Sequence, residues 1–192
     1  MAAVLIAFFL AVGVAAHAFD ELHDRPLGTR ISDRALTVVG AAALVGAIAV
    51  GVAGILTVSV TLLPFVVIGG IICPAYNLEL FGGRFHTATW FALAWGALPA
   101  WTGYWVNAPR FSAAGVLVGV ACAGLSLAQR RLSAPARRLR RQTATVRGQQ
   151  VLTDGTAIEL SRSELLEPLD GALQALSAAI ALLAGGLLVG RL

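Results

Sequence analysis

Long apolar runs separated by short charged segments dominate the chain. Apart from His17, no charged side chain occurs in residues 2–19, and none occurs in residues 35–78. A membrane-spanning helix needs about 20 apolar residues. The apolar run at 35–78 is about twice that length, so we expect it to fold back on itself at residues 57–59. The pattern predicts six spans, at residues 2–19, 36–56, 60–76, 87–106, 111–128 and 172–190.

These spans predict an all-α fold, a polytopic membrane bundle of about six helices. Residues 1–128 would hold five spans, with loops at 20–35 and 77–86, and residues 171–192 would hold the sixth. The stretch between them, residues 129–170, is polar. In it, Asp154-Gly155 lies between short segments with β-branched residues, a pattern typical of a small hairpin. Ser161 or Ser163, followed by Glu164, predicts the start of a helix.

Composition narrows the class of protein. Apolar residues make up 58% of the 192 positions and charged residues 12%, which excludes a disordered chain, a collagen-like repeat and a disulfide scaffold. The two cysteines, Cys73 and Cys122, lie in apolar runs and are expected to be reduced core residues. All 14 basic residues are arginine, so lysine Schiff-base chemistry and a phosphate-binding lysine loop are excluded.

The arginines indicate an orientation, because positively charged loops remain in the cytoplasm. We expect a multi-pass protein of the cell membrane with both termini outside and residues 129–170 cytoplasmic. Only Arg110 and Arg191 would then lie outside. Ala16-His17-Ala18 resembles a signal-peptidase site, but no positive charge precedes it, so we expect the first span to be retained. The arginines expected inside are Arg25, Arg30, Arg34, Arg84, Arg130, Arg131, Arg137, Arg138, Arg140, Arg141, Arg147 and Arg162.

An acidic group ends the first span. His17, Asp20, Glu21 and Asp24 are spaced i, i+3, i+4 and i+7, which places them on one stripe of a helix. Neighbouring carboxylates repel unless a cation lies among them, and Mg²⁺ is held by one or two carboxylates with water and phosphate oxygens. The alternative is a solvated helix end, with Asp24 and Arg25 in ordinary surface pairs.

Two stretches carry a family resemblance. Asp20 and Asp24, followed by Arg25-Pro26-Leu27-Gly28 and Ile31-Ser32, resemble the first aspartate-rich motif of the UbiA superfamily of intramembrane prenyltransferases. Residues 75–84 are similar to that family's cytoplasmic tyrosine-containing loop. Residues 95–99 and 102–104 follow in the family's order, so the resemblance covers about residues 20–128.

The resemblance implies a UbiA-like partial bundle that binds a prenyl diphosphate. Asp20 and Asp24 would hold Mg²⁺ at a pocket open to the cytoplasm. The substrate-binding residues it implies are His17, Glu21, Arg25, Tyr76, Asn77 and Arg84. Glu79 would pair with Arg84 or face the Asp20 stripe, whereas His23 and His86 would be solvated.

The chain also departs from the family. Ala16 and His17 replace the asparagine-aspartate pair that opens the family motif, and residues 128–135, where the second motif is expected, contain no acid. A non-catalytic lipid-binding or scaffold subunit is therefore the alternative to a prenyltransferase. A second copy or a partner membrane subunit could supply the absent acids. A small transporter has weaker support, because no other span carries buried charge.

An arginine cluster follows the fifth span. Clusters of this kind attract anionic membrane lipids at about 1 kcal/mol per charge. Direct contact with a diphosphate is the alternative, and nucleic-acid binding is not expected because aromatic residues are not interleaved. The expected headgroup-binding residues are Arg130, Arg131, Arg137, Arg138, Arg140 and Arg141.

Overall fold

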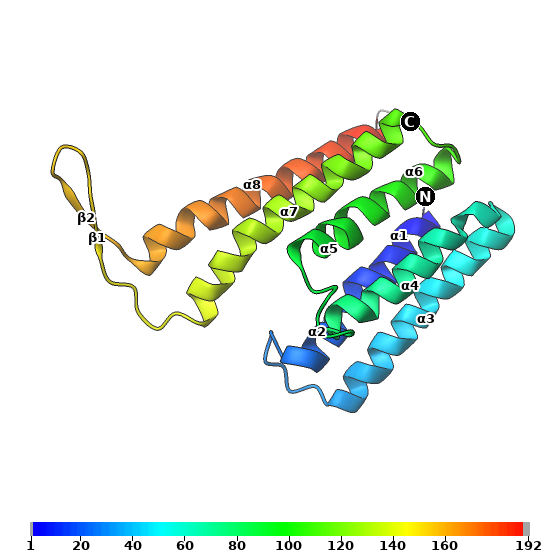
Figure 1. The fold of residues 1–192 in the computed structure, drawn as a ribbon, viewed down its shortest axis with the longest axis horizontal. Coiled ribbons are helices and arrows are strands. Elements are labelled where there is room, and N and C mark those ends of the chain that lie inside the picture. Colours follow the sequence, from blue (N-terminus) through cyan, green and yellow to red (C-terminus); the bar gives the residue numbers. More distant parts are fainter. Residues whose placement is uncertain (1, 190–192) are drawn as a thin grey trace. The chain divides into compact units, whose positions relative to one another are not determined.

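The computed structural model describes residues 2–189 as a mainly helical chain with one small hairpin (Figure 1). The chain divides into two compact units, Met1–Leu127 and Ala128–Leu192, and helix α7 runs from the first into the second. The two units are described in turn.

The first helix of unit 1 is interrupted by a wider turn. α1 (Ala2–Phe8) continues through the π-helical segment η1 (Phe9–Ala15) into α2 (Ala16–Asp24). π-helical turns release carbonyls from the regular bonding pattern. Two carbonyls in η1 meet side chains: Cys73 Sγ donates to Ala11 O at 3.4 Å, and His17 Nδ1 lies 2.9 Å from Val12 O.

The next two helices form the antiparallel pair expected from the long apolar run. α3 (Asp33–Thr57) begins at Ser32, whose hydroxyl accepts the N–H of Ala35 at 3.3 Å. It ends at the predicted turn, and the 3₁₀ segment η2 (Val60–Leu62) leads into α4 (Leu63–Asn77). Gly40 lets α2 approach α3, because a Cβ there would lie 2.6 Å from the ring of Phe19.

The rest of unit 1 is a helical run followed by the first part of α7. α5 (Ala88–Ala92), η3 (Leu93–Ala97) and α6 (Leu98–Asn107) are continuous, and α7 extends over Ala113–Arg141. Between them, at the turn, Tyr104 Oη lies 2.5 Å from Ser112 Oγ.

Five described helices are long and apolar enough to cross a membrane. The run at 88–107 has the length of a span, about 30 Å at 1.5 Å per residue. It is less apolar than the other spans because it carries all four tryptophans, a tyrosine and a proline. The expected fourth span, residues 87–106, is therefore not among them. The five are Ala2–Asp24, Asp33–Thr57, Val60–Asn77, Ala113–Arg141 and Arg162–Leu187.

The core of unit 1 is small and consists mostly of small side chains. One cluster includes Ala15, Phe19 and Cys73, and a second includes Ile72 and Leu98. Many large apolar side chains lie outside this core and are exposed. Extended exposed apolar surface of this kind marks contact with a membrane or another protein, in agreement with helices that could span a bilayer.

Unit 2 is a helical hairpin with a two-stranded tip. α7 continues to Arg141, 13 residues beyond the predicted end of its span, because Arg, Leu, Ala and Gln are good helix formers in water as well as in lipid. Strands β1 (Gln149–Val151) and β2 (Ala157–Glu159) pair antiparallel around Asp154-Gly155, where the sequence predicted a hairpin.

The last helix, α8 (Arg162–Val189), begins ten residues before the expected span. Ser161 caps it reciprocally with Glu164. The Ser161 hydroxyl accepts the Glu164 N–H at 3.2 Å, and the Glu164 carboxylate accepts the Ser161 N–H at 2.7 Å. This is a capping box, and it explains why the helix starts in the polar segment and not at its apolar boundary.

Candidate functional site

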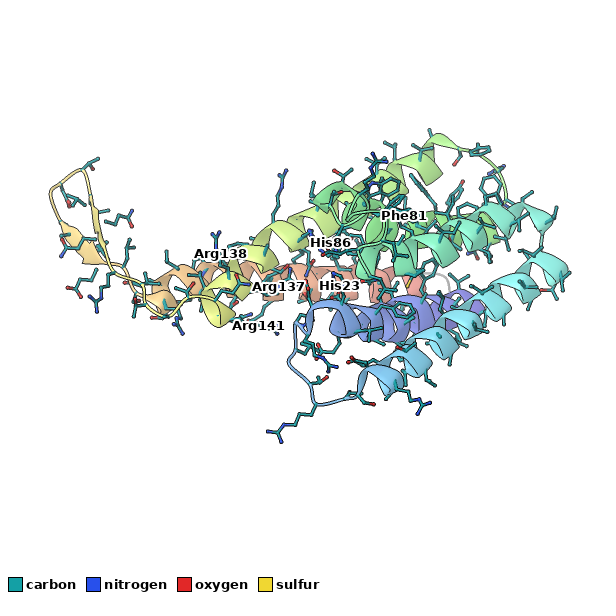
Figure 2. The ribbon with its side chains drawn as sticks, turned by 60° about the horizontal axis from the view of Figure 1, so that its bottom comes forward. His23, Phe81, His86, Arg137, Arg138 and Arg141 are labelled. Carbon is teal, nitrogen blue, oxygen red and sulfur yellow. The ribbon has the colours of Figure 1, made fainter. Side chains whose placement is uncertain are left out.

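Two loops lie at the same end of unit 1. Residues 25–32 join α2 to α3, and residues 78–87 join α4 to α5. Because α2 packs against α4, the ends of these helices bring the loops close to each other. His23 and His86 are labelled at this end of the unit in Figure 2. The sequence likewise predicted that both loops lie on one side of the membrane.

Glu21 is a buried carboxylate that holds the first loop. Its side chain is only 3% exposed. One carboxylate oxygen accepts the N–H of Leu27 at 2.9 Å, and the other accepts the N–H of Thr29 at 2.6 Å. Charged hydrogen bonds of this kind offset the cost of burying a carboxylate. Glu21 therefore bonds to the protein's own backbone.

Arg25 holds the same loop from the other side. It is in the left-handed backbone conformation (φ 50°) that ends α2. Its guanidinium donates to the carbonyls of Thr29 at 3.1 Å and Ile31 at 2.8 Å, and it forms an ion pair with Asp33 at the start of α3. Glu21 and Arg25 together give residues 25–32 a defined path without secondary structure.

The side chains of His23, Asp24 and Glu79 form a group of possible metal ligands where the two loops meet. His23 Nε2 lies 3.9 Å from Asp24 Oδ1 and 3.9 Å from Glu79 Oε2. All three donor atoms lie within 4.8 Å of one another. We call these residues the His23–Asp24–Glu79 group. It joins the last turn of α2 to the loop after α4.

His86 contacts the group from its outer side. Its Nδ1 lies 3.1 Å from the carbonyl oxygen of Tyr76 and 3.5 Å from Glu79 Oε1. Because a carbonyl can only accept, Nδ1 carries the proton in this arrangement. The imidazole also stacks on Tyr76, with ring centroids 4.6 Å apart. His86 is thus held by two contacts to Tyr76, and its Nδ1 also lies near the Glu79 carboxylate.

Tyr76 and Asn77 are both buried at the end of α4. The Tyr76 ring also contacts Trp95 in η3, at a centroid distance of 4.6 Å. The Asn77 side-chain amide donates to Cys73 O at 2.7 Å, one turn back along α4. These contacts place both residues in the packing beneath the loop, and their predicted substrate-binding role stays a prediction.

The other sequence-predicted residues are exposed or half-buried. His17 is exposed and bonds within its own helix, Asp20 is half-buried, and Arg84 is exposed. The structure therefore brings Asp24 into the His23–Asp24–Glu79 group, whereas Asp20 is not part of that group. Glu79 faces two histidines, one on each carboxylate oxygen.

The sequence left Glu79 facing the acidic stripe as one alternative, but it did not predict the contacts of His23 and His86 with Glu79. Each is a single residue without a recognisable metal-ligand spacing, so no local pattern marks it. The available signal was positional. His23 lies directly before Asp24, and Glu79 and His86 lie in the loop that the sequence already placed on the same side.

An apolar cavity of about 210 Å³ lies between the halves of the helices that are farther from the two loops. Its walls come from α1, α3, α4 and α6, and Gly51, Gly54, Gly69 and Gly70 make part of its lining. The turn at 57–62 closes the same end of the unit, so the cavity is remote from the two loops along the helix axes. Nearly all of its lining is aliphatic or aromatic.

In unit 2, the arginine cluster is mainly a surface feature. Arg131, Arg137, Arg138 and Arg141 are exposed, and Arg130 is half-buried. Arg140 forms an ion pair with Asp170 of α8. Near the hairpin, Arg162 donates to the carbonyls of Thr143 and Ala144, so it links the start of α8 to the chain after α7.

Comparison with family models, with curated proteins and with solved structures found no match to this chain. The resemblance to UbiA-type prenyltransferases therefore stays a prediction from the motifs alone.

Proposed function

We propose that this chain is a multi-pass membrane protein that binds the diphosphate headgroup of an isoprenoid lipid at the end of the bundle where the two loops meet. The headgroup is bound with a divalent cation. Mg²⁺ is the cation implied by the UbiA-like motifs, with diphosphate oxygens and water filling most of its coordination positions.

The observation that supports this proposal is the meeting of Asp24 with Glu79. These carboxylates come from the last turn of α2 and from the loop after α4, and their donor atoms lie within 4.8 Å of each other. Two carboxylates at this separation repel unless positive charge lies near them. Asp24 and Glu79 take the place that the sequence assigned to Asp20 and Asp24, and exposed Arg84 lies on the same loop as Glu79.

The arginine distribution supports the sidedness of the proposal. If the run at 88–107 is a sixth span, both loops and residues 129–170 face the cytoplasm and both termini face outward. Twelve of the 14 arginines then lie on the cytoplasmic side, as the positive-inside rule requires. The loops thus face the compartment that holds soluble diphosphates.

The test is a titration of detergent-purified protein with geranylgeranyl diphosphate, in Mg²⁺ and in EDTA. We expect binding that depends on Mg²⁺ and that weakens at least about tenfold, or about 1.4 kcal/mol, in Asp24→Asn and in Glu79→Gln. Asp154→Asn, on the hairpin of unit 2, is the matched control. Binding unchanged in both site variants would contradict the proposal.

Asp20→Asn distinguishes the motif from the observed group. A loss confined to Asp20→Asn and Asp24→Asn would identify the motif aspartates as the ligands. A loss confined to Asp24→Asn and Glu79→Gln would identify the group seen in the structure.

A non-catalytic lipid-binding or scaffold role is the second candidate. It is favoured by Glu21, because this motif acid is bound to two backbone N–H groups and is thereby occupied in holding a loop. In that case a lipid co-purifies with the protein and is retained equally in Mg²⁺ and in EDTA. Turnover of geranylgeranyl diphosphate with an acceptor would instead establish an enzyme.

A further inference from the structure

The group at the loops adds a nitrogen donor to two carboxylates. Mg²⁺ prefers oxygen donors throughout, whereas an imidazole nitrogen suits first-row transition metals and zinc. His23 Nε2 is 3.9 Å from each of the two carboxylate oxygens, so an imidazole lies between the acids. We propose that the His23–Asp24–Glu79 group is a binding site for a zinc-class divalent metal. This inference rests on the proposed function for the choice of site.

The spacing of the donors fits one ion. With two separations of 3.9 Å and a third of at most 4.8 Å, the point equidistant from the three atoms lies no more than about 2.5 Å from each. Zinc bonds to histidine nitrogen and carboxylate oxygen measure about 2.0–2.2 Å. An inward shift of a few tenths of an ångström completes the site. His23 and Asp24 are exposed, and packing does not prevent this movement.

Separations of 3.9 Å are also too long for hydrogen bonds. Among the described contacts, His23 is therefore related to the two carboxylates by ion-pair distances and not by hydrogen bonds. Among the described residues, this is a group of three ligand-type side chains close enough to share an ion.

His86 supports the ion from outside the coordination sphere. Its Nδ1 lies 3.5 Å from Glu79 Oε1, while the other oxygen, Oε2, faces His23. Polar groups beside a metal-binding carboxylate commonly influence its position and its affinity for the ion. The Tyr76 carbonyl and ring hold His86 in this orientation. His86 thus helps to position Glu79 at the proposed site without itself binding the ion.

Three protein donors leave a fourth position of a tetrahedral ion open. At the end of the bundle, that position can take water or a phosphate oxygen. The same metal would therefore give the lipid headgroup of the proposed function a direct ligand. The group would bind the metal without lipid as well, because all three protein donors belong to this chain.

The experiment is a Co²⁺ titration of the lipid-free, full-length protein in detergent, without a polyhistidine tag. We expect visible d–d absorption that saturates at one Co²⁺ per chain and is displaced by Zn²⁺ but not by an equal concentration of Mg²⁺. His23→Ala and Glu79→Gln should each weaken the affinity for Co²⁺ at least about 100-fold, and His86→Ala about 10–100-fold. His17→Ala is the control, because His17 lies on the same helix outside the group and should leave the titration unchanged.

Because Asp24 is exposed, we expect Asp24→Asn to fold as the parent does. It should also weaken Co²⁺ binding. Absorption that never develops at stoichiometric Co²⁺, or that persists in His23→Ala and Glu79→Gln, overturns the metal site. The proposed function fails separately, in the titration with geranylgeranyl diphosphate in Mg²⁺. A protein that binds this lipid but not Co²⁺ would refute only the present inference.

Discussion

The two charged regions of this chain are organised in opposite ways. At the loops of unit 1, Glu21 and Arg25 bond mainly to backbone groups and determine the path of residues 25–32. In unit 2, the arginines of α7 remain largely on the surface. Both regions have a high density of charge in the sequence. Burial and backbone partners, more than charge density, therefore distinguish a charged side chain that holds the fold from one that is available to bind a ligand.

Replacement of Glu21 should have the largest effect on stability. In Glu21→Gln, an amide N–H₂ takes the place of one carboxylate oxygen, so one backbone donor of Leu27 or Thr29 faces another donor. Unsatisfied buried polar groups are among the costliest defects in a fold. We expect the melting temperature in detergent to fall by several degrees, measured by circular dichroism.

Glu167→Gln, on an exposed position of α8 in unit 2, is the matched control and should leave the melting temperature nearly unchanged. Equal melting temperatures for the two variants would show that Glu21 is no more structural than a surface glutamate.

Removal of surface arginines should have a smaller effect that depends on lipid. Arg137→Gln with Arg138→Gln removes two exposed charges, each expected to contribute about 1 kcal/mol to the binding of anionic lipid. The double variant should fold as well as the parent but lose much of the thermal stabilisation that phosphatidylglycerol confers. Melting temperatures in detergent with and without this lipid measure the difference.

Arg30→Gln with Arg34→Gln removes the same charge from unit 1 and serves as the control. If this pair lost as much of the stabilisation by lipid, lipid binding would depend on the total charge and not on the cluster on α7.

The smallest effect is expected at the hairpin turn of unit 2. The Thr156 N–H donates to Asp154 Oδ1 at 2.9 Å and holds the pKa of this carboxyl below its ordinary value of 3.8. The ionised form therefore stabilises the turn at pH above that value, and the contribution is lost as the pH falls through the lowered pKa. Asp154→Ala should increase amide exchange in β1 and β2 severalfold at neutral pH.

Mass-spectrometric hydrogen exchange measures this effect, with Thr145→Ala, outside the strands, as the control. Exchange that is the same in Asp154→Ala and the parent at neutral pH would show that Gly155 alone maintains the turn.

Much of the fold was predictable because apolar length and turn chemistry are local properties. The turn at 57–59, the Asp154-Gly155 hairpin and the Ser161 cap each depend on a few neighbouring residues. The end of α7 was not predicted, since hydropathy marks the expected end of the span at residue 128 and Arg130–Arg141 can stay helical in water. The role of Glu21 was not predictable from its helical stripe, because its partners Leu27 and Thr29 lie beyond the helix end. The approach of Glu79 to His23 depends on the packing of α2 against α4.

The widened turn η1 (Phe9–Ala15) has a consequence for the angular phase of the first helix. A π turn carries one more residue than an α turn, and one residue corresponds to about 100° around a helix axis. Deleting a single residue there would rotate all of α2 relative to α1. Phe19 would leave the space above Gly40 and His23 would turn away from Glu79 in the same step. The rotational setting of a single helix thus links a close apolar contact of unit 1 to the polar group at its end.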